Sequence, residues 1–467
     1  MKRTFILTCL AVALQLTCFG QLRIPHVLSD NMVLQRNANA NIWGWGYAST
    51  EVAIIASWLS DTVKTKVDAG GRWLAQVPTT QAGGPYELEI LSAGSKITLH
   101  NILLGDVWLC SGQSNMEWGG NQQLQEILDE LPHAKDSQIR LLQVSRTAAD
   151  YPQDDITNSW QALSAESLKP FSGIGYFIAK RLRAELDVPI GIINASWGGT
   201  PAEVWTPAYI IENDPELRRL GAMQGDAPYR PKDAGVLWNS MIRPLTPFVL
   251  SGFYWYQGES NVGTWVGYDK LMRAMVTSWR MAWNAELPFY FVQIAPFAYG
   301  NELPLAALLR EQQEMTAKTL PRTGMVVVSD LVDNIKDIHP KQKLEVANRL
   351  AAIALNEYYG VGKDKDYRSP LYKGHRTQGK SITISFEYLE NGLQVKGDHI
   401  TDLYIAGKDR VFHEAKALIK GNELIVSSPE VNDPVAVRFG FTETAMPNLF
   451  NKNGLPVAPF RTDDWSF

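Results

Sequence analysis

The segment GDVWLCSGQSNM, residues 105–116, decides how this chain is interpreted. An apolar run breaks at small residues and then presents a single serine, Ser114. The pattern predicts a strand that ends at Cys110 and a helix that begins near Asn115, so Ser114 would face the positive N-terminus of that helix. A hydroxyl in that position is suited to attack on an ester, and a simple helix cap is the structural alternative. The segment lacks the second glycine of G-x-S-x-G, which disfavours the α/β-hydrolase superfamily.

Three further strand-like runs end in loops with chemically useful residues: residues 188–194, 252–256 and 324–329. The first precedes Gly198 and Gly199, whose backbone N–H groups are free to point at a developing oxyanion. The second precedes the block that contains Gln257, and the third leads to His339. Because the carboxyl ends of parallel strands meet at one edge of a sheet, we expect these loops to converge on Ser114.

His339 is the best placed of the seven histidines, on a loop before a helix expected over residues 341–358. A nearby carboxylate would fix its tautomer for work as a general base, and a surface histidine in a helix-capping loop is the alternative. Glu259 is the one carboxylate inside a glycine block. It either holds the nucleophile loop or the histidine through hydrogen bonds, or it braces Gly258.

Together these motifs resemble the sialate O-acetylesterase family of SGNH hydrolases, a group of carbohydrate esterases. The resemblance runs in family order through residues 29–36, 112–116, 197–201 with Trp205, 239–244, 255–261, 287–297 and 337–341. It implies an SGNH-hydrolase-like α/β fold, a three-layer α/β/α domain with a parallel sheet. It also implies a cofactor-free serine esterase that removes O-acetyl groups from carbohydrates, first of all from sialic acids. Acetylxylan or another acetylated polysaccharide is an alternative substrate.

The resemblance makes Ser114 the nucleophile and His339 the base. The position three residues before the histidine, where such enzymes usually carry the third triad member, is Lys336. Asp337 is the nearest carboxylate. Either Asp337 or Asp333 orients the histidine, or a backbone carbonyl does so and leaves a Ser-His dyad.

The resemblance also implies an oxyanion hole, built from the Ser114 amide, the Gly198-Gly199 turn and a side chain near Gln257. Ser260 replaces the usual asparagine of this block, which leaves Gln257 or Asn261 as the side-chain donor. Gln257 is the favoured donor, with Asn261 holding the loop. A non-catalytic carbohydrate-binding protein is the hypothesis from another class, and it has no need of the serine and histidine.

The order of element patterns predicts three domains after an N-terminal signal. Residues 21–104 give short alternating runs separated by polar or glycine-bearing turns, as in a β-sandwich. Residues 105–367 alternate strands with helical stretches such as 173–186 and 269–283, as in a parallel sheet covered by helices on both faces. Residues 368–467 are again β-rich.

The N-terminus predicts export. Lys2 and Arg3 precede an apolar stretch over residues 5–16, and small residues follow, so cleavage is expected near Gly20. Acylation of Cys18, as in a bacterial lipoprotein, is the alternative. After cleavage only Cys110 remains, so the mature chain holds no internal disulfide. That favours a periplasmic or secreted bacterial protein.

Composition excludes several other functions. The net charge of −5 argues against nucleic acid or an anionic membrane as a partner. No later run approaches the roughly 20 apolar residues that a membrane span needs. The histidines are scattered without metal-ligand spacing, and no phosphate-binding glycine loop is present, so neither a metal nor a nucleotide cofactor is expected. Trp197, Trp205 and Trp255 either stack on sugar or fill the core. The oligomeric state is left open.

Overall fold

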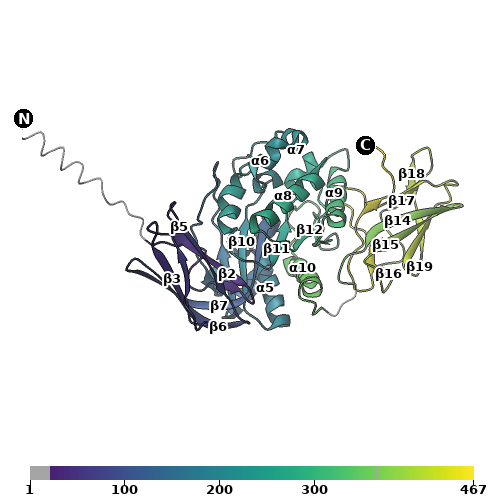
Figure 1. Ribbon diagram of the computed structural model, residues 1–467. Helices are drawn as coiled ribbons and strands as arrows, with labels where there is room; N and C mark the ends of the chain where they lie inside the picture. The colour runs from purple at the N-terminus through teal and green to yellow at the C-terminus, as the bar shows by residue number, and fades with distance from the viewer. Residues whose placement is uncertain (1–21, 363–365) are drawn as a thin grey trace, which may run out of the picture.

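The computed structural model of this chain describes residues 22–362 and 366–467, so the predicted export signal at residues 1–20 lies outside the described residues. Three groups of elements lie in a row in Figure 1. Strands form the N-terminal group, helices around a sheet form the central group, and strands form the C-terminal group. The central group carries the candidate site.

The central sheet has the strand order β13-β12-β11-β7-β10-β8-β9, and every neighbouring pair is parallel except β8 and β9. Its strands are β7 (Ser95–Gly112), β8 (Ile139–Gln143), β9 (Gln161–Ala162), β10 (Ile190–Ser196), β11 (Gly252–Tyr256), β12 (Phe289–Val292) and β13 (Thr323–Val326). The carboxyl ends of the parallel strands therefore share one edge, as the sequence predicts. β11 has the expected bounds, whereas β13 ends three residues before the predicted limit at residue 329.

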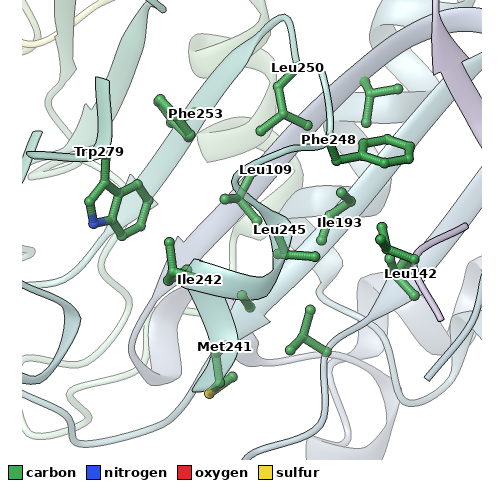
Figure 2. Close-up of a cluster of buried hydrophobic side chains, with 14 of the residues drawn as sticks. Leu109, Leu142, Ile193, Met241, Ile242, Leu245, Phe248, Leu250, Phe253 and Trp279 are labelled. Carbon is green, nitrogen blue, oxygen red and sulfur yellow. The ribbon is translucent and has the colours of Figure 1, made fainter. Parts of the chain in front are cut away.

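Helices cover both faces of this sheet. Successive side chains of a strand point to opposite faces, so neighbouring residues of one strand pack against different helices. Trp108 packs in one buried cluster with α5 and α10, and Leu109 packs in another with α8 and α9. Figure 2 shows Leu109 in the second cluster, with Phe253 of β11 and Trp279 of α8. The helices are α5 (Gly173–Leu186), α8 (Tyr268–Trp283), α9 (Leu305–Thr319) and α10 (Lys343–Glu357).

The local sequence explains where these helices form. The Ser172 hydroxyl accepts the Gly175 N–H at 3.0 Å and caps α5, which spans the predicted residues. Buried residues of α8 recur every four positions, at Leu271, Met275 and Trp279. The shorter helices are α2 (Ser114–Glu117), α3 (Gln125–Glu130), α4 (Ala165–Leu168), α6 (Ala208–Asn213) and α7 (Pro215–Gly221).

The N-terminal strands share β7 with the central sheet. The first half of β7 pairs with β6 and β1, and its second half pairs with β10 and β11. Beyond β6 this sheet continues in the order β6-β3-β4, and β2 and β5 form a separate pair. The predicted domain boundary between residues 104 and 105 therefore falls inside one continuous strand. The N-terminal strands are β1 (Val33–Gln35), β2 (Asn39–Trp45), β3 (Glu51–Ala56), β4 (Val63–Lys66), β5 (Arg72–Pro78) and β6 (Gly83–Ser92).

The C-terminal strands form two four-stranded sheets, β14-β15-β20-β19 and β18-β17-β21-β23, and the β16-β22 pair. They enclose a buried cluster that includes Ile384, Ile405 and Phe439. An ion pair between Arg461 and Glu311 at 2.8 Å connects this group to α9. The strands are β14 (Leu371–Gln378), β15 (Ser381–Glu387), β16 (Leu393–Val395), β17 (Leu403–Ala406), β18 (Phe412–Glu414), β19 (Lys416–Lys420), β20 (Glu423–Ser427), β21 (Ala436–Phe439), β22 (Leu449–Asn451) and β23 (Phe460–Arg461).

Candidate active site

Ser114 lies at the carboxyl edge of the central sheet, between the end of β7 and the start of α2. β7 runs two residues past the predicted end at Cys110, to Gly112. Gly112 has a φ of +133°, and a Cβ there would lie 2.2 Å from the carbonyl oxygen of Tyr256. Only glycine lets the strand pass so close to β11 before it turns into the helix. The turn therefore sets Ser114 beside the loop that follows β11.

His339 reaches Ser114 from the loop between β13 and α10. Its Nε2 atom lies 2.9 Å from Ser114 Oγ. Its ring stacks on Trp118, with the ring centroids 4.0 Å apart and the planes 21° from parallel. Burial, followed by the positive charge of Lys343, lowers the pKa of His339 to about 4. The imidazole is thus neutral at neutral pH and can accept a hydroxyl proton.

Asp337 lies beside His339 but contacts its backbone instead of its ring. Asp337 Oδ1 accepts the His339 N–H at 2.9 Å, whereas the distance from that oxygen to Nδ1 is 3.7 Å, too long for a hydrogen bond. The other carboxylate oxygen pairs with Lys341 at 2.9 Å. Asp333, the alternative partner, is exposed and accepts a hydrogen bond from Gln342 at 3.3 Å. The structure brings neither carboxylate onto the histidine ring.

The Gly198-Gly199 turn lies against Ser114, as the sequence predicts. A Cβ on Gly198 would lie 3.3 Å from Ser114 Cβ. The N–H of Gly198 donates to Glu117 Oε2 at 2.8 Å, and this bond contradicts the predicted role of Gly198 as an oxyanion donor. The backbone N–H groups of Ser114 and Gly199 donate to no acceptor within the described part of the chain. These two are the amides that a substrate oxygen can use.

The structure contradicts the predicted oxyanion role of Gln257 and Asn261. Gln257 is fully buried, and its Nε2 donates to Thr200 O at 3.2 Å and to Asn261 Oδ1 at 2.8 Å. Asn261 is equally buried and donates from Nδ2 to Glu203 Oε2 at 2.9 Å. Both amides have their donors committed within the loops after β10 and β11. They brace the site instead of facing Ser114.

Two charged residues that sequence reasoning missed also lie at the site. Glu117 is one helical turn after Ser114, and its second oxygen forms an ion pair with Arg146. Arg146 follows β8, and its side chain is 49% exposed. The i, i+3 spacing from Ser114 was the available signal for Glu117. A guanidinium that remains open to solvent is therefore paired with the residue one helical turn after Ser114.

The tryptophans divide between core and site. Trp205 and Trp255 are fully buried and pack edge to face at 6.1 Å. Trp197 is half-buried and donates from its indole to Tyr229 O at 3.0 Å, and Trp118 stacks on His339. Among the described residues, no group of three or more histidine, cysteine, aspartate or glutamate side chains is arranged to hold a metal ion. Over the same residues, no helix is long and apolar enough to cross a bilayer.

Comparison with known proteins agrees with this geometry. A sequence model of the family described as carbohydrate esterase, sialic acid-specific acetylesterase matches residues 104–356. Sialate O-acetylesterase from Homo sapiens is 30% identical over 390 residues, which cover 75% of this chain and 73% of the human protein. The Rattus norvegicus sialate O-acetylesterase is 28% identical over 431 residues, covering 78% and 79% of the two chains. A crystal structure of a carbohydrate acetylesterase from Xanthomonas citri matches with a TM-score of 0.87 at 37% identity, over 95% of this chain and 100% of that one.

Fold and relatives together define this protein as a carboxylic ester hydrolase. The predicted three-layer α/β/α arrangement around a parallel sheet, with additional β-rich regions at both ends, is confirmed. Within that class, the chain belongs to the sialic acid-specific acetylesterase family of carbohydrate esterases.

Proposed function

We propose that Ser114 is the nucleophile and His339 the general base in the removal of acetyl groups from sugar hydroxyls. One observation carries this proposal: His339 Nε2 lies 2.9 Å from Ser114 Oγ, at the sheet edge where the glycine turn also ends. A hydroxyl and an imidazole at this distance form the activated pair that nucleophilic catalysis needs.

The reaction proceeds in two steps. His339 Nε2 takes the Ser114 proton as Oγ attacks the acetyl carbonyl carbon. The tetrahedral intermediate then breaks its bond to the sugar oxygen, which receives the proton from the imidazolium. In the second step, His339 deprotonates a water that attacks the acetyl-serine. The bond to Oγ breaks, Ser114 regains its proton and acetate leaves.

The oxyanion is held by the backbone N–H groups of Ser114 and Gly199, both without a protein acceptor among the described residues. Gly198 contributes indirectly, because its bond to Glu117 fixes the turn. A missing oxyanion donor typically raises the barrier by about 3 kcal/mol. Asp337 orients His339 through the backbone N–H, so the working unit is a Ser-His pair with a supporting carboxylate.

The proposed substrates are O-acetylated sialic acids. The named relatives include sialate O-acetylesterases, and sialic acids carry a carboxylate that neutral sugars lack. Arg146, half exposed and in contact with Glu117 one helical turn after Ser114, supplies a positive charge for this carboxylate. Acetylated neutral polysaccharide is the second candidate, because the relative from Xanthomonas citri is named only as a carbohydrate acetylesterase.

We also propose that the protein is exported across a bacterial membrane, with cleavage near Gly20. Lys2 and Arg3, followed by the apolar residues 5–16, support this proposal. Sequencing the N-terminus of protein purified from its native host tests this. A mature chain that begins after Gly20 would support it, and a lipid-modified Cys18 would replace it with membrane anchoring.

The Ser114→Ala variant tests the chemistry. We expect a folded protein that has lost hydrolysis of 4-nitrophenyl acetate and labelling by a serine-reactive organophosphonate. Ser111→Ala is the matched control, since the Ser111 hydroxyl is buried and donates to Ala195 O at 2.6 Å. The control should keep the label. Near-normal activity in Ser114→Ala would refute the mechanism.

A further inference from the structure

The residue directly after Ser114 joins three loops of the site. Asn115 is buried, and its Nδ2 atom donates to the carbonyl oxygen of Ile338 at 3.1 Å and to Glu259 Oε1 at 2.5 Å. Ile338 directly precedes His339, and Glu259 lies in the loop after β11. One side-chain amide therefore connects the serine's helix to the histidine's loop and to the glycine block. The sequence predicts that Glu259 either holds the nucleophile loop or the histidine, or braces Gly258. The contact with Asn115 corresponds to holding the nucleophile loop.

Lys343 determines which way that amide points. Its side chain is buried, and its ammonium group donates to Asn115 Oδ1 at 2.6 Å. In its protonated form Lys343 has donors and no acceptor, so the charged side chain forces the amide oxygen towards itself. The amide nitrogen must then face Ile338 O and Glu259. An apolar side chain at position 343 would leave the amide free to turn over, with its oxygen against two acceptors.

Lys343 is itself held in place as the first residue of α10. Glu126 Oε2, on α3, accepts the backbone N–H groups of Lys343 and Leu344 at 2.8 Å and 2.9 Å. The Lys343 ammonium also lies 5.5 Å from the ring centroid of Tyr256, at the end of β11. The Lys343 side chain thus extends into the site from the capped N-terminus of α10. Because Glu126 holds this terminus, the ammonium group has a defined position.

We infer that Lys343 is a positioning residue of the hydrolysis. By orienting the Asn115 amide, it holds the backbone before His339 where Nε2 reaches Ser114 Oγ. This inference rests on the proposed roles of the serine and the histidine. It adds a residue that no sequence motif singled out and that lies outside the reacting atoms.

The charges around Lys343 give the inference a second readout. The charged groups that face it are Glu259, Lys341, Glu126 and Asp337. Burial, against the attraction of Glu259, lowers the pKa of Lys343 to about 7. Below that pH its positive charge, after burial, is the largest influence that keeps the pKa of His339 low. Removing the charge stabilises the imidazolium, so the pKa of the histidine should rise.

The Lys343→Met variant tests both consequences, with Lys336→Met as the matched control. Lys336 lies on the same loop as His339, and its side chain is exposed. In Lys343→Met we expect kcat for 4-nitrophenyl acetate to fall about 10- to 100-fold with KM nearly unchanged, since a small displacement of reacting groups has that effect. The acidic limb of the kcat/KM profile should move to higher pH. Lys336→Met should match the wild type in both respects.

A wild-type kcat and acidic limb in folded Lys343→Met would overturn the inference. If that variant does not fold, Asn115→Asp takes its place, because aspartate keeps the shape and the contact with Lys343 but removes the donor to Ile338 and Glu259. Wild-type kcat in Asn115→Asp would equally overturn it. Ser114→Ala is assayed alongside, and activity in that variant would reject the proposed function itself. An inactive Ser114→Ala with a fully active Lys343→Met rejects the positioning role alone.

Discussion

The backbone N–H of His339 donates to Asp337 Oδ1 at 2.9 Å, while the ring nitrogen Nδ1 of the same histidine lies 3.7 Å from that oxygen. The carboxylate therefore fixes the chain at the histidine and leaves Nδ1 without a bond to it. A conventional triad would place the carboxylate on the ring. In this site the imidazole ring stacks on Trp118, and Asn115 donates to the carbonyl oxygen of Ile338, the residue before the histidine.

Asp337→Asn should reduce kcat far less than His339→Ala. Asparagine keeps an oxygen that can accept the His339 N–H, so we expect a loss of about tenfold or less, against roughly a thousandfold or more for the missing base. Steady-state kinetics on 4-nitrophenyl acetate measures both. Equal losses in the two variants would establish a full triad and contradict the geometry described above.

The pH dependence follows from the low pKa of His339. Burial, then Lys343, lowers that pKa from 6.5 to about 4, and only the neutral imidazole accepts the serine proton. The value of kcat/KM should stay level as pH falls through 6 and then decrease around pH 4. An acidic limb near the ordinary histidine value would show that the imidazole is more solvated than in this structure. Circular dichroism at each pH separates loss of activity from unfolding.

Arg146→Ala should distinguish anionic from neutral substrates. Loss of a charge-assisted hydrogen bond costs about 1.5–3 kcal/mol, which corresponds to a KM for O-acetylated sialic acid raised by tenfold or more. KM for uncharged 4-nitrophenyl acetate should change little. Arg181→Ala is the control, because Arg181 is paired with Glu185 on the exposed side of α5. Parallel increases in KM for both substrates would assign Arg146 to loop support through Glu117 and not to substrate charge.

Gln257→Ala should lower stability more than turnover. The substitution removes the donor to Thr200 O and to Asn261 Oδ1, and the acceptor Oε1 of the Tyr268 hydroxyl at 2.7 Å, all in a buried region. We expect the free energy of unfolding to fall by about 2 kcal/mol or more, with kcat of the folded enzyme within a few-fold of wild type. The exposed Gln125→Ala on α3 is the control. A stable variant with a hundredfold lower kcat would restore Gln257 to the oxyanion hole.

Much of this site could be predicted because strand ends are visible in sequence. Ser114 and His339 each follow an apolar run, and parallel topology brings such ends together whatever fills the loops between them. Two regular elements of the central group, α5 and β11, have the bounds that their sequence patterns predicted.

The side-chain partners of the site could not be predicted in the same way. Gln257 and Asn261 have suitable donors, but whether an amide faces a substrate or a neighbouring loop depends on packing between segments far apart in the chain. The same holds for Lys343, which reaches Asn115 across 228 positions. No local pattern records such a contact. The oxyanion assignment was wrong because residue type alone does not give direction.

The continuous strand β7 limits how modular this enzyme can be. The strand that ends beside Ser114 begins in the N-terminal sheet, where it pairs with β6 along most of that strand. A truncated chain that starts at residue 105 would remove β6 together with the part of β7 that pairs with it, and would shorten the strand that leads to Ser114. The flanking sheet is therefore not an appendage that an engineer can exchange or remove. Transplanting the catalytic unit into another scaffold requires taking the N-terminal strands with it.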